Sequence, residues 1–216
     1  AAGRRLRVAQ WTRSGCPFVA ATPEAYPRCA EWQHDALALV DQLHPDLVVV
    51  GNRSTAYTTD PGAGGLSRVR HLVAPDGTVA TSVPRALGLW ERALRSTVEQ
   101  LHERVVAVVV VGGAPVYGSA FPSPSVVRPD IVAPVLPRAE VATVHDPVVA
   151  AERRALRGID QVAYVDPVPI LCGRTCSPFL QGLWRYLDGY DLNQLGGRLL
   201  APEIGRAIDR ALVQPG

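Results

Sequence analysis

The sequence predicts a three-layer α/β/α sandwich with a mainly parallel sheet, and two observations carry this prediction. Short Val-rich runs of strand length alternate with longer stretches in which apolar residues recur at helical spacing. The runs are apolar at consecutive positions, which is typical of parallel strands covered by helices on both faces. The predicted strands are Leu6–Thr12, Asp46–Gly51, Val105–Gly112 and Gln161–Val165, and the predicted helices are Cys29–Leu43, Ala86–Arg104, Pro147–Arg157 and Leu192–Val213.

The elements alternate from strand to helix four times along the chain. The first and fourth strands are predicted from short apolar or alternating segments. The second and third are predicted from the apolar runs from Leu47 to Val50 and from Val105 to Val111. Neither run approaches the roughly 18 residues that a bilayer-spanning helix needs. Pro147 stands where the first turn of a helix tolerates proline, and Pro202 fits either a first turn or the restart of a broken helix.

Two long irregular stretches interrupt the alternation, and each follows a predicted strand directly. Asn52–Arg85 contains a glycine cluster at positions 62–65, and Gly113–Asp146 is rich in proline. Loops of this length in a compact domain are commonly functional. The loops at the carboxyl ends of parallel strands build the binding crevice of an open α/β sheet. We therefore expect one domain with two elaborated loops.

Length and composition narrow the class of protein. The chain has 216 residues, of which 47% are hydrophobic and 19% are charged, so a disordered or fibrous class is excluded. The net charge of +2 is too balanced to favour nucleic acid as a partner. All 22 basic residues are Arg, as in proteins from GC-rich genomes, and there is no Met even at position 1. We expect the chain to be a piece of a longer protein.

The four cysteines form two local pairs, Cys16 with Cys29 and Cys172 with Cys176. Reduced buried thiols, zinc ligands and two short-range disulfides are the alternatives. Neither pair is C-x-x-C and no His lies at ligand spacing, so no metal site is expected. The turn residues around both pairs favour two disulfides, which need an oxidising compartment.

The segment before the last predicted helix carries two acidic residues. Asp191 stands where an N-cap would satisfy first-turn amides. Asp188 lies just before it, on a loop after the last strand, where hydrolases of the α/β class keep their acid and base. Trp184 and Tyr186 beside it fit either core packing or stacking on a sugar ring.

Further candidate site residues lie in or next to the two long loops. Asn52 is either a hydrogen-bond donor to an oxyanion or a turn former, and Arg53 beside it is a candidate for substrate binding. Ser54 follows in a turn that lacks the Gly-x-Ser-x-Gly geometry of a nucleophile. Among the five histidines, His145 is the best catalytic candidate, with a solvent-exposed loop residue as the alternative. Gly112-Gly113 has neither Lys nor a phosphate-loop pattern, so no nucleotide cofactor is expected.

The ordered motifs of the chain resemble the SGNH hydrolase-like domains fused to acyltransferase-3 membrane proteins, which share a flavodoxin-like layout. The terminal block of that family reads roughly Tyr-x-Asp-x-x-His-Leu, then Gly and Leu-Ala-Pro. The matching positions are Tyr186, Asp188, Leu192, Gly196 and Leu200-Ala201-Pro202. Earlier matches are Ser14-Gly15-Cys16-Pro17, Cys29-Ala30-Glu31-Trp32, His44-Pro45-Asp46 with the strand after it, Val108–Pro115, and Val165-Asp166-Pro167 with Cys172 and Cys176. The resemblance covers nearly the whole chain.

The departures from the family pattern concern its catalytic triad. The family's Gly-Asp-Ser block follows its first strand, whereas Leu6–Thr12 resembles its second strand, so the resemblance puts the nucleophile upstream or makes it absent. The family His falls on Asp191. A carboxylate with a pKa of about 4 cannot accept and return a proton as an imidazole does near neutral pH. Asp188 is the one triad member that the resemblance leaves in place.

The resemblance implies an extracytoplasmic C-terminal domain, tethered to the membrane in a cell-envelope acyltransferase of an actinobacterium-like organism. The membrane-embedded region would deliver an acyl group, and this domain would pass it to a glycan or glycolipid acceptor without a cofactor. Two alternatives stay open. One is a non-catalytic domain that binds glycan or supports the membrane region, and the other is a secreted serine esterase with an unrelated site in the long loops.

Overall fold

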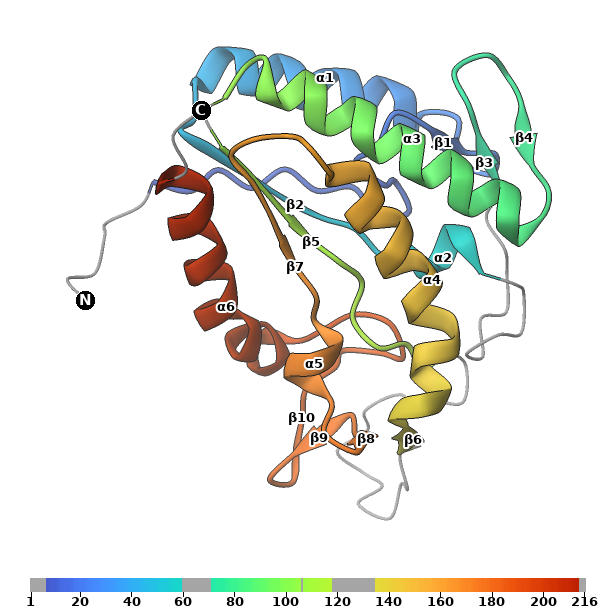
Figure 1. The fold of residues 1–216 in the computed structure, drawn as a ribbon, viewed down its shortest axis with the longest axis vertical. Helices are drawn as coiled ribbons and strands as arrows, with labels where there is room; N and C mark the ends of the chain where they lie inside the picture. The colour runs from blue at the N-terminus through green and yellow to red at the C-terminus, as the bar shows by residue number, and fades with distance from the viewer. Residues whose placement is uncertain (1–6, 60–70, 106, 118–134, 214–216) are drawn as a thin grey trace.

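The computed structural model describes residues 7–59, 71–105, 107–117 and 135–213. Its main sheet has three parallel strands, β2 (Leu47–Gly51), β5 (Ala107–Val111) and β7 (Val162–Val165), in the order β2-β5-β7. Helices lie on both sides of this sheet (Figure 1). The three-layer α/β/α class and three of the four predicted strands are confirmed.

The two helical layers bury opposite faces of the sheet. Helices α1 (Cys29–Leu43), α3 (Val83–His102) and α4 (Arg138–Leu156) contribute to one core with Val48, Val50 and Val108. Helix α6 (Gln194–Val213) covers the other face, where Ala207 and Ala211 pack with Val109 and Val165. The short helix α5 (Val168–Leu171) follows β7 directly.

The remaining elements are short. An antiparallel sheet is formed by β1 (Thr22–Pro23), β3 (Leu72–Val73) and β4 (Val79–Ala80). Strand β6 (Leu136–Pro137) pairs with β8 (Thr175–Cys176), and β9 (Phe179–Leu180) pairs with β10 (Leu183–Trp184). Helix α2 (Thr55–Thr58), β3 and β4 lie within the stretch that the sequence predicted to be irregular. The glycine cluster at 62–65 and most of the proline-rich loop, residues 118–134, lie outside the described residues.

The predicted strand Leu6–Thr12 is wrong for the part that the structure describes. Residues 7–12 form no strand, and every residue from 7 to 14 is exposed. Val8 is 83% and Trp11 50% exposed. Alternating apolar residues favour an extended backbone, but a strand also needs a neighbour whose amides and carbonyls pair with it. Residues 7–12 pair with no strand among the residues that the structure describes.

Helix α4 begins at Arg138 and not at the predicted Pro147, which lies inside it. An interior proline removes one helical hydrogen bond. Here Val141, His145, Val148 and Glu152 keep helical spacing on the buried face before and after the proline, so packing offsets that loss. Two other helices differ from their predicted bounds by only a few residues. Helix α3 begins at Val83 where Ala86 was predicted, and α6 begins at Gln194 where Leu192 was predicted. The fourth, Cys29–Leu43, is confirmed.

Both local cysteine pairs are disulfides, as the sequence predicted. Cys16–Cys29 ties the N-terminal segment to the start of α1, and Cys172–Cys176 closes the turn after α5. Each disulfide stabilises the fold by restricting the unfolded chain, and Cys16–Cys29, which closes the longer loop, should stabilise it more.

The N-cap of α6 is Asn193 and not Asp191. The Asn193 Oδ1 atom accepts a hydrogen bond from the Gly196 amide at 3.0 Å, and its Nδ2 group donates to the Trp184 carbonyl at 2.7 Å. A Cβ atom at Gly196 would collide with the Arg185 carbonyl, whereas one at Gly197 would meet nothing within 4 Å. The cap and the close approach at Gly196 together seat α6 against the loop that carries Asp188.

We expect Gly196→Ala and Gly197→Ala to shift stability in opposite directions. The first should lower the free energy of unfolding by about 1–3 kcal/mol because a backbone carbonyl must move. The second should raise it by up to about 1 kcal/mol, because alanine is the better helix former and the space is open. Urea unfolding of the two variants measures this, and equal effects would contradict the close approach at Gly196.

Candidate functional site

The carboxyl ends of β2, β5 and β7 open at the same edge of the sheet, because all three strands are parallel. The loop before α6 docks against two of the chain segments that leave this edge. The Tyr117 amide, after β5, donates to the Gly189 carbonyl at 2.8 Å. The Arg53 guanidinium, after β2, lies 4.7 Å from the centre of the Tyr190 ring, in cation–π geometry. The predicted site residues Arg53 and Asp188 are therefore brought to one edge.

The Asp188 carboxylate is engaged by its own loop. Its Oδ1 atom accepts hydrogen bonds from the amides of Tyr190 and Asp191, each at 2.7 Å. This is the local side-chain-to-backbone pattern by which Asp fixes a turn. The residue is exposed. Asp188 therefore shapes the loop that it stands on.

No imidazole partners either acid in the described part of the chain. Asp191 is exposed, and neither it nor Asp188 has a hydrogen bond to a histidine there. The five histidines lie elsewhere: His34 on α1, His44 at its C-cap, His71 before β3, His102 at the end of α3, and His145 inside α4.

His145 is neither in a loop nor exposed, in contrast to the sequence prediction. It is 3% exposed, and its Nε2 atom lies 3.1 Å from the Ala114 carbonyl. Burial is the main cause that lowers the pKa of this imidazole below its ordinary value of 6.5. A neutral imidazole that donates its Nε2 proton to Ala114 fits this environment. His145 therefore holds the segment that follows β5.

Asn52 is also tied to the backbone. Its Oδ1 atom accepts from the Phe18 amide at 2.8 Å, and its Nδ2 group donates to the Phe18 carbonyl at 3.5 Å. This reciprocal pair joins the loop after β2 to the segment that precedes β1. The amide that was a candidate oxyanion donor is thus oriented toward Phe18.

The Tyr186 ring packs inside the domain. It is 1% exposed and meets the Tyr117 ring edge to face, with centroids 5.0 Å apart. Burial raises the pKa of Tyr117 to about 12 and that of Tyr186 as well. Trp184 is partly buried and packs against Phe179, with ring centroids 4.0 Å apart. The aromatic residues that precede Asp188 thus pack toward the interior and anchor its loop.

A buried polar cluster that the sequence did not predict lies under the same edge. Glu152 on α4 is 2% exposed. Its Oε2 atom accepts from the Tyr164 hydroxyl at 2.6 Å, its Oε1 atom accepts from Trp90 Nε1 at 3.2 Å, and Ser54 faces the same carboxyl group. Burial raises the Glu152 pKa above its ordinary value of 4.5. The only signal in the sequence was a lone acid on the apolar face of the helix.

This cluster fixes the turn after β5 at Gly112 and Gly113. A Cβ atom at Gly112 would collide with the Tyr164 hydroxyl and lie 3.1 Å from Glu152 Oε2. One at Gly113 would lie 3.5 Å from Ser54 Oγ and 3.8 Å from His145 Cε1. Glycine is needed at position 112 because Tyr164 and Glu152 approach the turn so closely, whereas the distances at Gly113 are those of ordinary van der Waals contact.

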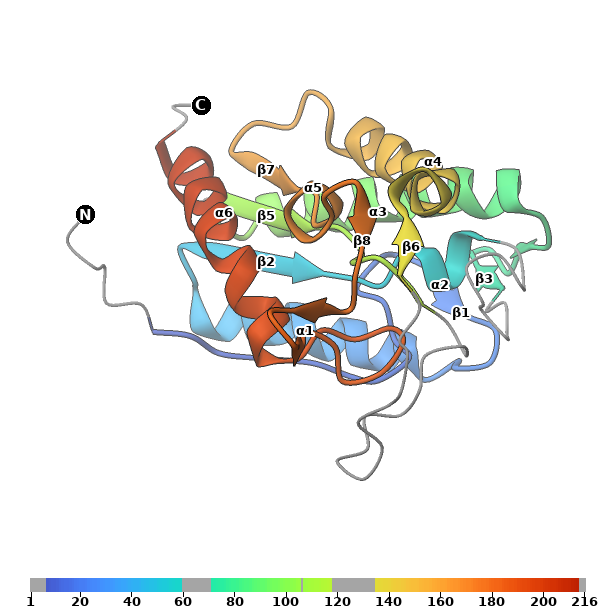
Figure 2. The ribbon, with the colours of Figure 1, turned by 90° about the horizontal axis from the view of Figure 1, so that it is seen from below.

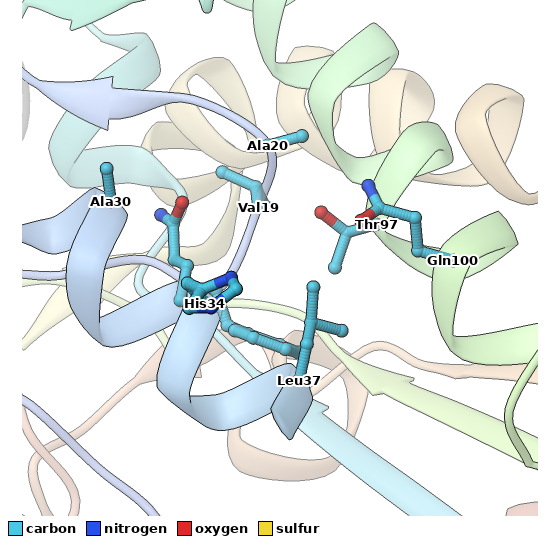
Figure 3. Close-up of a pocket in the computed structure, with 9 residues that line it drawn as sticks. Val19, Ala20, Ala30, His34, Leu37, Thr97 and Gln100 are labelled. Carbon is cyan, nitrogen blue, oxygen red and sulfur yellow. The ribbon is translucent and has the colours of Figure 1, made fainter. Parts of the chain in front are cut away.

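A separate cavity of about 200 Å³ lies between α1, α3 and residues 18–20 (Figure 3). Leu37, Val19 and Ala20 give it apolar walls, and Gln33, Thr97 and Gln100 give polar ones. None of the predicted site residues lines it. Over the ranges that the structure describes, no group of three or more His, Cys, Asp or Glu side chains is arranged to hold a metal ion.

A comparison with known protein families shows which family this chain belongs to. The family described as "SGNH domain (fused to AT3 domains)" matches residues 1–206. The chain belongs to this family. No curated protein and no solved structure matches it. The SGNH match spans both disulfides, the parallel sheet and the loop with Asp188 and Asp191, so the resemblance seen in the ordered motifs is confirmed.

We expect Glu152→Gln to change how the stability of the SGNH domain depends on pH. Because burial raises its pKa, the Glu152 carboxyl holds its proton more tightly in the folded than in the unfolded state, so its contribution to stability is fully present below about pH 4.5 and is lost as the pH rises through the raised folded pKa. Relative to the Glu152→Gln variant, the wild type should lose about 1.4 kcal/mol of unfolding free energy for each unit that separates the folded and unfolded pKa values of Glu152. Urea unfolding at about pH 4.5, 6 and 7.5 tests this, and parallel pH curves for the two proteins would contradict a raised pKa of the buried Glu152.

Proposed function

We propose that this SGNH domain serves a membrane acyltransferase that O-acylates envelope glycans or glycolipids, and that its triad is degenerate, with Asp188 fixing a turn and orienting no base. Its membership in a family fused to AT3 domains associates it with acyl transfer. The observation that carries the second part is the position of Asp188. It lies at the carboxyl edge of the sheet without an imidazole partner among the described residues, and Asp191 stands where the family has His.

Acyl transfer to a sugar needs groups that Asp188 and Asp191 do not provide. An oxygen nucleophile attacks the acyl carbonyl carbon, its proton passes to a base, and the leaving group then takes a proton as the tetrahedral intermediate collapses. The base must hold and release a proton near neutral pH, which an exposed carboxylate does poorly. Ser54 is 1% exposed, so its hydroxyl is covered in this conformation. The nucleophile and base of the proposed reaction would therefore come from outside the residues assigned to this site.

The compartment and partners follow from the same proposal. Two disulfides suit an extracytoplasmic location, in the cell envelope of an actinobacterium-like organism. Over the described ranges, no helix is both long and apolar enough to cross a bilayer. The membrane-embedded acyltransferase region of the same protein would supply the acyl group, and a glycan or glycolipid would accept it. A non-catalytic role in glycan binding is the second candidate, favoured by Asp191 and by the turn-forming hydrogen bonds of Asp188.

A serine-directed fluorophosphonate probe tests the incomplete triad. We expect no labelling of the 216-residue chain, and none of Asp191→His, because a restored base still has no nucleophile to activate. Asp191→Asn is the matched control, and an active serine hydrolase in the same sample verifies the probe. Mass spectrometry of the labelled peptides identifies any modified serine.

Each positive result would overturn a different part of the proposal. Labelling of Asp191→His alone would mean that a nucleophile already lies beside this loop. Labelling of the wild type at Ser54 or at another loop serine would support the alternative of a secreted esterase with an unrelated site.

A further inference from the structure

The cavity between α1 and α3 runs from an exposed rim to a buried floor. Its volume is about 200 Å³, and residues 18–20, the backbone wall, line one side of it. His34 on α1 is exposed at the rim, whereas Thr97 on α3 is 5% and Val19 is 1% exposed. Figure 3 shows His34 and Thr97 on opposite sides of this space. A ligand that enters it would therefore contact both helices.

The backbone wall has no regular secondary structure, but it is fixed in position. Gln33 on α1 donates from Nε2 to the carbonyls of Pro17 and Ala21, at 2.8 and 3.0 Å, on either side of the wall. The Cys16–Cys29 disulfide ties the same segment to the start of α1. Because these bonds already hold the wall, a ligand can bind there without first ordering a loop. The cavity is thus preformed, as small-molecule sites usually are.

The polar side chains of the cavity offer hydrogen-bond acceptors. The Nε2 group of Gln33 is used by the two carbonyls, so its Oε1 atom is the one left for a ligand. Gln100 Nε2 lies 3.3 Å from both the carbonyl and the hydroxyl oxygen of Ser96, so its Oε1 atom is left as well. The Thr97 hydroxyl donates to the Ala93 carbonyl at 3.0 Å and can still accept. Within the described ranges, no group donates to any of these three oxygens.

The lining of the cavity selects the class of ligand. Among the described residues, no Asp, Glu or Arg lines it, so a charged ligand would lose its hydration without a compensating charge. A purely apolar ligand would leave the three acceptors without water or a donor, which is also costly. Phe18 and Leu37 add apolar surface. These features fit an uncharged ring with several hydroxyl donors and an apolar face. Sites for drug-sized ligands hold about 300–1,000 Å³, so this smaller cavity takes a single ring.

We propose that the cavity is a binding site for one uncharged sugar ring. The hydroxyls of the sugar donate to Gln33, Thr97 and Gln100, and its C–H face packs against Phe18 and Leu37. No residue of the loop with the two acids lines the cavity, so this site does not depend on the proposed acyl transfer.

Asn52 connects this cavity to the carboxyl edge of the sheet. Figure 2 shows α1 running alongside β2, and β2 leads directly into Asn52. The Asn52 side chain bonds both the amide and the carbonyl of Phe18 in the backbone wall. A sugar packed on Phe18 is thus one hydrogen-bonded residue away from the loop that carries Arg53. In this proposal, Asn52 positions the wall of a binding site.

Amide NMR of the isotope-labelled chain, titrated with glucose, galactose, mannose and N-acetylglucosamine, tests the site. At least one of these sugars should bind with a Kd on the order of 1–10 mM, as expected for about a dozen non-hydrogen atoms. It should shift the side-chain amide signals of Gln33 and Gln100 and the backbone signals of residues 18–20 in a saturable way.

Two pairs of variants localise the binding. Thr97→Val replaces the hydroxyl acceptor by a methyl group of the same shape and should weaken binding about fivefold. Thr143→Val is its matched control, because the Thr143 hydroxyl also donates to a carbonyl of its own helix, at 2.7 Å, and lies outside the cavity. Ala30→Phe fills the exposed rim and should abolish binding while the unfolding midpoint stays unchanged. Ala150→Phe, at an exposed position of α4, should change neither.

Three results would overturn the proposal. If none of the four sugars gives a saturable shift at these residues, the cavity binds no sugar ring. Binding that survives Ala30→Phe would place the sugar elsewhere on the chain. Tighter binding of hexanoate or glucuronate than of every uncharged sugar would assign the cavity to an apolar chain or to an anion.

Discussion

Helix α4 and the turn after β5 are in contact through two buried polar side chains, Glu152 and His145, and the loops at the carboxyl edge are arranged around this contact. The Glu152 carboxyl holds Tyr164 and Trp90, which come from β7 and α3. His145 holds Ala114 just beyond the glycine turn. Leaving such a carboxyl without its partners would cost several kcal/mol, so these elements are fixed as a unit.

The Asp188 loop packs against the segment after β5 that His145 holds in place. Tyr117 continues the segment that His145 holds, and its amide bonds Gly189 while its ring packs on Tyr186. Arg53 then links the loop to the end of β2 through Tyr190. The edge thus lies where open α/β sheets bind their ligands, but its polar side chains are largely used to hold the backbone in place.

The sequence predicts the parallel sheet and both disulfides well, because buried Val-rich strands and local cysteine pairs leave strong local signals. It misplaces the features that depend on distant partners. The alternation in Leu6–Thr12 cannot reveal that residues 7–12 pair with no strand in the described part of the chain. Pro147 fits the first turn of a helix, so the sequence predicted that the helix starts there and placed His145 in the loop before it. Asp191 fits an N-cap, but Asn193 caps the helix in the structure. The Glu152 cluster joins residues far apart in sequence, so no local pattern could indicate it.

We propose that the Asp188 carboxyl, which accepts two amide hydrogen bonds of its own loop, forms a turn and does not act as a triad acid. Asp188→Asn in the AT3-fused protein tests it most directly, because the asparagine Oδ1 atom can still accept both amide hydrogen bonds while the charge is removed. The measurement is the rate of acyl transfer to the glycan acceptor, with Asp188→Ala, which should lose about 1 kcal/mol of stability, as the structural control. We expect Asp188→Asn to transfer at the wild-type rate. A loss of transfer by a hundredfold or more in a stably folded Asp188→Asn protein would make Asp188 a catalytic acid and contradict the account.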